Sequence, residues 1–442
     1  SSDSGATWTP LTHTCLSGEV TTVAYSPDYA NDAALFVGGA GGMAKLDRNG
    51  CQLTYHDAVY TLAFSEEYLG TGALYLGGAV GVFASHDRGA TWEKMSDGLG
   101  SQPVHALLRA QSRPTLLWAG TSAGAWDYTI PDASTVKTLI LTNRERLVAF
   151  YGAAEADAVI AKLYNLASYT EAPGLVLDLG NTALSPTTAT AYAAWVAQPT
   201  SANANAVAAA VGGVVQGVLQ QYTNTKFLVI VGGDTIVPFY RTPDETSTRE
   251  GRYRATTPLA PSGAISTTVS TALDDNFTLT DDYYASRQPT YLPQGGVFYA
   301  PSLAVGRLVE TPADIRAAID TFLASPNIRT DSTAFVSGAD DYLLDSATAM
   351  ANAMKNAGLE TQTLISNSWG ASDERAALLD APSTLIGLNQ HGYHDRLVSP
   401  QRTAVTAQDI ATSQADMRRA LIVALACHAG LNIPDAGGPN TL

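Results

Sequence analysis

The chain has 442 residues, 45% of them hydrophobic, and a formal net charge of −16. This length allows two or three domains with substantial cores. An acidic surface repels phosphate backbones, so we expect no nucleic acid partner. We also expect no membrane span, because no run is long and apolar enough. The alanine- and valine-rich stretch 204–219 is predicted to be a buried helix.

The first 130 residues contain an internal repeat. Residues 22–26 (TVAYS) match 61–65 (TLAFS), and 35–40 (LFVGGA) match 74–79 (LYLGGA), both with an offset of 39. A weaker third copy includes 116–121 (LLWAGT). A period near 40 with short strands and glycine turns is typical of propeller blades. Roughly three blades fit here, too few to close a propeller. The missing blades lie outside the chain, or the strands form a partial arc.

Residues 1–8 and 85–92 share the pattern S-x-D-x-G-x-x-W. The pattern resembles the Asp-box (BNR) hairpin of sialidase-type propellers, whose residues are structural. The resemblance implies turn amides bound by an aspartate, unusual dihedrals at a glycine, and a tryptophan packed between strands. The residues concerned are Asp3, Asp87, Gly5, Gly89, Trp8 and Trp92.

From residue 136 the pattern changes to alternating strands and helices. Strands are predicted at 136–141, 175–179, 227–231 and 303–308. Helices are predicted at 153–167, at 187–220 with a break after Pro199, and from a Thr311-Pro312 start to 322. Residues 241–296, rich in Thr, Ser, Pro and Asp, are predicted to form a long irregular excursion.

The last part of the chain repeats this alternation. Strands are predicted at 333–337, 361–365, 383–391 and 421–427, and helices at 345–356, 373–379 and 406–418. Such alternation is typical of a parallel sheet. His391 closes the third strand and Cys427 the fourth, so both are expected at the carboxyl edge where reacting groups collect.

The chain has three cysteines. Cys15 and Cys51 lie in the repeats and can pair, which leaves Cys427 as a reactive thiol or as a small buried hydrophobe. Its position at a strand end beside His391 favours a nucleophile and its base. His394 is an alternative base, whereas His428 is expected to be structural because neighbouring side chains on a strand diverge.

The order of these motifs resembles the gingipain-like (C25) cysteine peptidases of the caspase and legumain clan. The likeness rests on segments 228–234, 280–284, 303–308, 389–392 and 424–427. It implies a non-catalytic α/β subdomain over 136–328 and a catalytic subdomain over 331–442. Only fifteen residues follow Cys427, where family members continue with further strands, so we expect the catalytic part to be truncated.

The expected fold is therefore multidomain: all-β propeller-like repeats over 1–130, then a caspase-haemoglobinase-like α/β region with a parallel sheet. The expected function is a cysteine endopeptidase acting on proteins or peptides. Cys427 would attack the carbonyl, His391 would move the proton, and backbone amides of Gly392 and Cys427 would hold the oxyanion.

Three pairs of acids allow finer expectations. In this clan, residues just after the first catalytic strand help to form the pocket for the residue before the cut. Asp340 and Asp341 occupy that place and would select Arg or Lys by charge pairing, or would simply cap the next helix. No cofactor is expected to be required, although Asp274-Asp275 and Asp281-Asp282 are candidate calcium ligands or solvated loop acids.

A peptidase is one of several functions that the sequence allows. A non-enzymatic surface adhesive or structural protein with an inactive protease fold is the main alternative. A sialidase-like glycosidase would need an arginine cluster that the repeats lack. No H-E-x-x-H motif occurs. Few cysteines and exposed repeats favour an extracellular or cell-surface protein by analogy.

Overall fold

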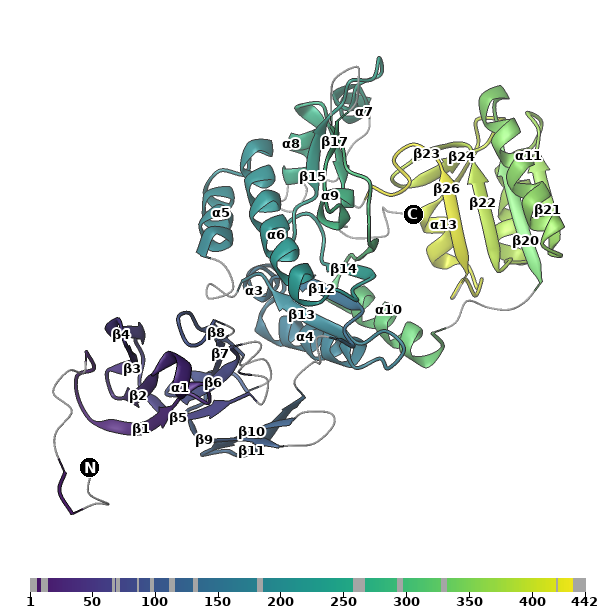
Figure 1. The fold of residues 1–442 in the computed structure, drawn as a ribbon. Coiled ribbons are helices and arrows are strands. Elements are labelled where there is room, and N and C mark those ends of the chain that lie inside the picture. The colour runs from purple at the N-terminus through teal and green to yellow at the C-terminus, as the bar shows by residue number, and fades with distance from the viewer. Residues whose placement is uncertain are drawn as a thin grey trace. The chain divides into compact units, whose positions relative to one another are not determined.

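The computed structural model describes residues 6–8, 15–65, 68, 72–85, 87–95, 99–110, 116–129, 134–180, 186–256, 267–291, 297–326, 332–418 and 420–431 (Figure 1). The chain divides into two compact units. Unit 1 comprises Ser1–Val136, Asn181–Ala189 and Gln220–Asn224. Unit 2 comprises Lys137–Gly180, Thr190–Leu219 and Thr225–Leu442.

Unit 1 contains antiparallel sheets in which each strand pairs with the next along the chain. The first sheet consists of β1 (Val20–Tyr25), β2 (Leu35–Gly39), β3 (Gly42–Asp47) and β4 (Gly50–Tyr55). The second consists of β5 (Val59–Phe64), β6 (Leu74–Gly78), β7 (Gly81–Ser85) and β8 (Glu93–Lys94). The third consists of β9 (Val104–Ala110), β10 (Leu116–Thr121) and β11 (Gly124–Thr129), and the short helix α1 (Tyr29–Asp32) joins β1 to β2.

The sequence repeat is also a repeat of strand register. Val20 lies opposite Gly39 in the first sheet, and Val59 lies opposite Gly78 in the second, with a register shift after the valine in both. Side chains from these two sheets share one buried cluster. The antiparallel repeat is confirmed, whereas the described residues do not show a propeller.

The turn of the second S-x-D-x-G-x-x-W segment has the expected geometry. Asp87 accepts a hydrogen bond from the Thr91 N–H at 2.9 Å, and Gly89 has a φ of +79°. A Cβ at residue 89 would overlap the Phe36 ring, so the close approach also requires glycine. Trp92 is 8% exposed and donates to the Thr54 hydroxyl at 3.1 Å.

The first such segment differs. Trp8 is 82% exposed, so the expectation that it packs between strands is wrong, because no described sheet precedes β1 to cover it. Asp3 and Gly5 lie outside the described residues. The expected pairing of Cys15 with Cys51 is confirmed by a disulfide with a Cα–Cα distance of 5.6 Å, and Cys427 is an exposed thiol.

Unit 2 begins with a four-stranded, fully parallel sheet in the order β13-β12-β14-β19. Its strands are β12 (Thr138–Thr142), β13 (Gly174–Asp178), β14 (Phe227–Val231) and β19 (Ala304–Leu308). The helices that join and follow them are α3 (Arg144–Tyr151), α4 (Ala153–Ala167), α5 (Pro186–Ala197), α6 (Ser201–Gln221) and α10 (Pro312–Ala324). Thr311 caps α10 with a full capping box, as the Thr-Pro pair predicts.

The excursion between β14 and β19 is more ordered than expected. It contains β15 (Tyr240–Pro243), α7 (Glu250–Thr256), α8 (Thr267–Asp274), β16 (Phe277–Thr280), α9 (Asp282–Ala285), β17 (Thr290–Tyr291) and β18 (Val297–Phe298). These elements are short, and β15 pairs with β16 far along the chain, Tyr240 opposite Thr280, which local patterns do not reveal. The prediction of an irregular loop over 241–296 is therefore wrong in this respect.

Helix α6 is the one described helix that is long and apolar enough to cross a membrane by length and composition. The expectation that no run of the chain is long and apolar enough to span a membrane is therefore wrong for this helix. The buried residues of α6 recur every three or four positions, which is the spacing of one helix face packed in a core. They are Ser201, Ala204, Val207, Ala208, Val211, Val215 and Leu219.

A second parallel sheet, in the order β21-β20-β22-β26, forms the rest of unit 2. Its strands are β20 (Thr333–Gly338), β21 (Glu360–Ile365), β22 (Leu385–Asn389) and β26 (Leu421–Leu425). The other elements are α11 (Asp341–Asn356), α12 (Ala371–Arg375), the π-helix η1 (Ala376–Asp380), β23 (His391–Tyr393), β24 (Arg396–Val398), β25 (Ala404–Thr406) and α13 (Ala407–Thr412).

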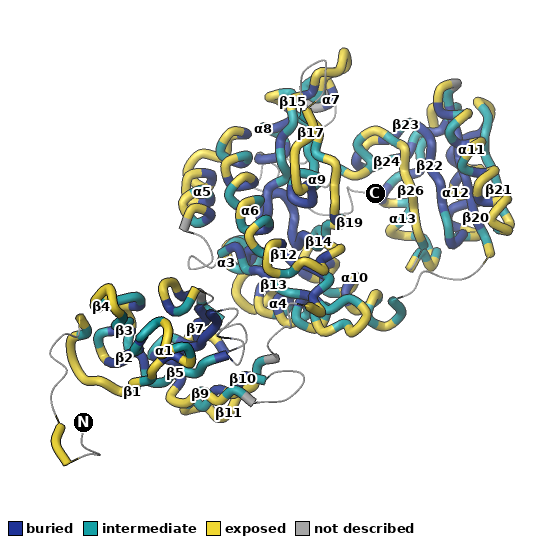
Figure 2. Tube along the Cα trace, in the orientation of Figure 1, coloured by how far each residue is buried: buried dark blue, intermediate teal, exposed yellow. Residues whose placement is uncertain are grey.

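Helices cover the two faces of this sheet. Ala347, Ala351 and Met354 of α11 pack against alternate residues of β20 on one face. Residues of η1 pack with Phe335 and Ile386 on the other. Figure 2 shows the central strands buried, whereas β26 at the edge is exposed along its length.

Two predicted helices in this region have different bounds. Helix α11 starts four residues before the predicted Asp345, because Asp340 occupies its N-cap position. The predicted helix over 406–418 ends at Thr412, and its start is capped by Thr406 with a full capping box. The hairpin strands β23 to β25 were not predicted, because each has only three residues.

Candidate active site

The parallel register of β22 and β26 brings the predicted nucleophile and base to one edge. Asn389 lies opposite Leu425, and His391 and Cys427 each follow by two residues. Neighbouring strands lie about 4.8 Å apart, so the two residues leave the sheet side by side. The Cys427 residue is exposed and the His391 side chain is 36% exposed, so both are accessible to a substrate.

Gly392 lies directly against the segment that carries the nucleophile. A Cβ built on Gly392 would lie 3.0 Å from the Ala426 Cβ and 3.1 Å from the Cys427 carbonyl oxygen. Such distances are tighter than most Cβ contacts, so the close approach favours a residue without a Cβ. The backbone after His391 and the backbone around Cys427 are therefore in contact.

Asp340 also reaches this edge, at the end of β20. Its Oδ2 lies 2.6 Å from Nε2 of His391. The Asp340 backbone has a φ of +61°, which L-residues rarely adopt, and its N–H donates to the Asn367 side chain at 2.8 Å. The hydrogen bond to Asn367 and the contact with His391 hold Asp340 in this unfavourable backbone conformation. Strain of this kind is common at functional sites.

Tyr342 completes the exposed edge. Its ring lies edge-on to His391 with centroids 6.3 Å apart, and the side chain is largely exposed. Partial burial, together with the charges of Cys427 and Asp340, raises the pKa of the Tyr342 hydroxyl. Asp340, Tyr342, His391 and Cys427 thus form one group of side chains that we call the edge cluster. Asp341 begins α11, and its side chain lies outside the described part of the chain.

The two other histidines near the site are already engaged. The His394 ring is buried, and its Nδ1 lies 2.8 Å from the Tyr253 hydroxyl. Burial lowers the pKa of His394, and the charge of Arg396 adds to this, against the opposing charge of Asp395. His428 places its Nε2 2.7 Å from a Glu250 oxygen. Among the three, His391 is the histidine on the exposed edge beside Cys427.

A buried polar group behind His391 was not predicted from the sequence. Ser337 donates to the Gln390 side chain at 2.5 Å, and the Asn389 side chain donates to the Ser337 carbonyl at 3.2 Å. Glu374 of α12 is fully buried, and neither carboxyl oxygen has a hydrogen-bond partner. Burial raises the pKa of Glu374 to about 7, a rise that nearby Gln390 moderates. The available signal was polar Asn389-Gln390 at the end of an apolar strand.

No group of three or more His, Cys, Asp or Glu side chains that could hold a metal occurs in the described part of the chain. Of the acids considered for calcium, Asp281 is paired with Arg307 at 2.5 Å, and Asp275 accepts from Ser201 at 2.9 Å. A structural calcium ion at these acids stays a prediction.

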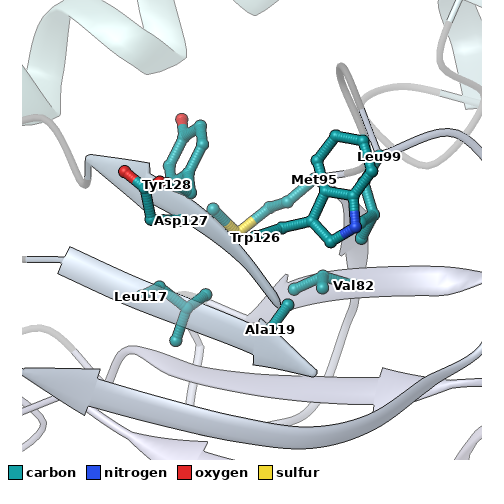
Figure 3. Close-up of a pocket in the computed structure, with 8 residues that line it drawn as sticks. All are labelled: Val82, Met95, Leu99, Leu117, Ala119, Trp126, Asp127 and Tyr128. Carbon is teal, nitrogen blue, oxygen red and sulfur yellow. The ribbon is translucent and has the colours of Figure 1, made fainter. Parts of the chain in front are cut away.

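An apolar hollow lies in unit 1, and no residue of the edge cluster lines it. It has a volume of about 160 Å³ and is lined by β10, β11 and the segment around β7 and β8 (Figure 3). Trp126, Met95 and Leu99 line it, and Asp127 is the one acid on its wall. It lacks any pairing of nucleophile and base, so it is not the candidate active site.

No protein-family model matches the chain, and no curated protein matches it. Among solved structures, one described as a protease has 12% identity and a TM-score of 0.43, over 69% of this chain and 55% of that one. The Arg-specific cysteine proteinase gingipain R has 12% identity and a TM-score of 0.40, over 68% and 56%. A complex of the pro- and mature domains of Porphyromonas gingivalis RgpB has 15% identity and a TM-score of 0.38, over 66% and 56%.

These likenesses are low in identity and in TM-score, so they carry no functional argument by themselves. The chain also spans little more than half the length of the structures that it matches. The strand-end geometry of the edge cluster is the basis for the function proposed next.

Proposed function

We propose that the chain is a cysteine endopeptidase with Cys427 as nucleophile and His391 as base. The observation that carries this proposal is the pairing of β22 with β26, which sets His391 and Cys427 at neighbouring strand ends. A thiol and an imidazole on one exposed edge are the parts that nucleophilic acyl transfer needs. Protein or peptide is the substrate class that this chemistry serves.

The reaction follows from these positions. His391 accepts the Cys427 proton, and the thiolate attacks the peptide carbonyl carbon to form a tetrahedral oxyanion. The C–N bond then breaks, and the leaving amine takes the proton from His391. Water, deprotonated by His391, attacks the thioester, and the acid product leaves with the thiol restored. The backbone N–H groups of Gly392 and Cys427, which lie on contacting segments, are the proposed oxyanion donors.

Asp340 takes a different role from the expected one in this proposal. Its carboxylate lies on Nε2 of His391, which leaves Nδ1 of the ring for the thiol. A carboxylate in this position fixes the tautomer of the imidazole and stabilises the imidazolium that forms. We therefore infer that Asp340 orients the base, as the third member of the edge cluster with Cys427 and His391.

A preference for Arg or Lys before the cut is the finer part of the proposal. A carboxylate pocket selects cationic side chains by charge pairing. With one oxygen of Asp340 on His391, the neighbouring Asp341 is the acid to test. Asp341→Ala should lower kcat/KM for Arg and Lys substrates and spare neutral ones. Unchanged selectivity in this variant would remove the preference from the proposal.

A non-enzymatic surface protein is the alternative, and one observation favours it. β26, which leads to Cys427, exposes four apolar side chains at 43–50%, namely Leu421, Ile422, Val423 and Leu425. An exposed apolar edge strand is a site where another chain adds to a sheet. In this alternative the edge of the sheet serves binding, and the thiol has no catalytic role.

The first experiment separates the two functions. A fluorogenic peptide library would be incubated with the protein and with Cys427→Ala, beside labelling by a peptide probe that alkylates active-site thiols. We expect cleavage and labelling in the protein and neither in the variant. Equal cleavage by both proteins, or no cleavage and no labelling in the parent protein, would contradict the peptidase.

We also propose an extracellular or cell-surface location. The Cys15–Cys51 disulfide supports it, because such bonds persist mainly in oxidising compartments. Fractionation of the producing cells, with antibodies against the chain, tests the location. Recovery of the chain from the reducing cytoplasm with both cysteines as thiols would contradict it.

A further inference from the structure

Helix α7, in the excursion between β14 and β19, contacts the residue that follows the nucleophile. Glu250 places Oε2 2.7 Å from Nε2 of His428. The Tyr253 ring stacks on the His428 ring, with centroids 3.5 Å apart and planes 4° from parallel. Both side chains of this contact are more than four-fifths buried, so water screens it only weakly.

The same tyrosine also holds the segment after the base. The Tyr253 hydroxyl lies 2.8 Å from Nδ1 of His394 and accepts the His394 backbone N–H at 3.1 Å. Tyr253 is itself 9% exposed, and its ring lies 5.8 Å from that of Tyr393. One helix therefore contacts both segments that carry the Cys427–His391 pair, one residue after Cys427 and three residues after His391.

The backbone at His428 has an uncommon conformation. Its φ is +58°, in the left-handed region that glycine adopts at least cost. The ring of this histidine contacts Glu250 through Nε2 and Tyr253 through its face, and these contacts can offset the backbone strain. Leu431 then packs on the cluster of Tyr253, Val269 and Leu273, which fixes the chain beyond the turn.

We propose that Glu250 and Tyr253 are positioning residues for the Cys427–His391 dyad. Together with His394 and His428, they form a set of contacts that we call the latch. Through the latch, the part of unit 2 that contains α7 sets the distance between the Cys427 thiol and the His391 imidazole. This inference rests on the proposed function. It adds that the part of unit 2 that carries the edge cluster needs α7 for full activity, although α7 contains no residue of that cluster.

Two substitutions test the latch one contact at a time. Glu250→Gln keeps the shape of the side chain and removes the carboxylate charge that faces His428. Tyr253→Phe keeps the stacked ring and removes the hydroxyl that contacts His394. We expect each to lower kcat about 10-fold and leave KM within about two-fold, because small misplacements of reacting groups slow the chemistry and not the binding. Glu245→Gln and Tyr291→Phe make the same changes at exposed positions and serve as matched controls.

His428→Gly separates the backbone from the ring. Glycine adopts the observed φ without strain, so this variant keeps the turn and loses both contacts of His428, those with Glu250 and with Tyr253. We expect a fall in kcat at least as large as in Glu250→Gln, and no further fall when the two changes are combined, because the ring that Glu250 contacts is already absent. Full activity in His428→Gly would overturn the proposal.

The alkylation rate of Cys427 by iodoacetamide gives a readout that needs no peptide substrate. We expect the three latch variants to react several-fold more slowly than the parent, because the thiolate loses its aligned imidazole. Urea unfolding of each variant shows the share that is folded. If the folded fraction of each variant is alkylated and turns over at the parent rate, and only its stability is lower, the positioning role is overturned. A parent without peptidase activity would contradict the proposed function, and unchanged alkylation in the variants would separately contradict the latch.

Discussion

Unit 2 contains two parallel sheets with the same strand order but different strand ends. In each, the second strand along the chain lies at one edge, the first and third are central, and the fourth lies at the other edge. The third strand of the first sheet ends at Gly232-Gly233-Asp234, whereas that of the second leads to His391. The same topology therefore supports two different carboxyl edges.

The first edge is closed by buried ion pairs. Asp234 and Arg241 lie 2.7 Å apart with side chains at most 2% exposed. Burial opposes ionisation of Asp234, but the Arg241 guanidinium holds the pKa of that carboxyl below its usual range. The corresponding pair at the second edge, Asp340 with His391, is about one third exposed. A closed ion pair stabilises a fold, whereas an open pair can meet a substrate.

Removing one member of the Asp234–Arg241 pair should therefore lower stability more than removing one member of the Asp340–His391 pair. Arg241→Leu leaves Asp234 buried without a counter-charge, and we expect it to lower the free energy of unfolding by about 3–5 kcal/mol. Urea unfolding followed by circular dichroism measures this, with Arg249→Leu at an exposed position of the same segment as a control. A loss similar to that of the control would show that the closed edge is not stabilised by the pair.

Two of the buried acids of unit 2, Asp234 and Glu374, should make the stability of the fold depend on pH in opposite directions. Asp234 has a lowered pKa, so the stability it contributes is present above its unfolded value and is lost as pH falls. Glu374 has a pKa raised from 4.5 to about 7, so it destabilises the fold progressively as pH rises between these values. Over this range the cost is on the order of 3 kcal/mol.

Glu374→Gln should remove that dependence. We expect the variant to match the parent near pH 4.5 and to be more stable by up to about 3 kcal/mol above pH 7. Free energies of unfolding measured from pH 4.5 to 8 check this. Parallel curves for the parent and the variant would show that Glu374 ionises freely in the folded protein.

At the open edge, the same kind of substitution should affect turnover and not stability. Asp340→Asn keeps the shape of the side chain and removes the charge on His391, and we expect kcat to fall by about 100-fold with little change in stability. Steady-state kinetics on Arg and neutral substrates measure it. A loss confined to Arg and Lys substrates would instead place Asp340 in the substrate pocket.

A smaller effect is expected in unit 1, away from both edges. Asp87→Ala removes the hydrogen bond to the Thr91 amide, and we expect a loss of about 1–2 kcal/mol without a change in kcat. Thermal unfolding, with Asp127→Ala on an exposed strand as a control, checks the first part. A change in peptidase activity would show that the turn matters beyond its own unit.

Much of the fold was readable because local patterns encode local elements. The predicted helix over 153–167 matches α4, and the predicted strand over 227–231 matches β14. Thr311 at the N-cap and Pro312 at the first position predicted the start of α10, since both act within one turn. The helix over 406–418 was overextended, because helical composition alone does not show where packing ends it.

The sequence alone determined the alternation of strands and helices and the repeat of 39 residues, and it allowed the pairing of Cys15 with Cys51 that the structure contains. It also brought His391 and Cys427 to ends of consecutive strands. Only the tertiary structure decided which side chains meet there: Asp340 on His391, and Glu250 on His428 across 178 residues. The reason is physical. Periodicity and capping act over a few residues, whereas the direction of a side chain at a strand end depends on what packs beside it.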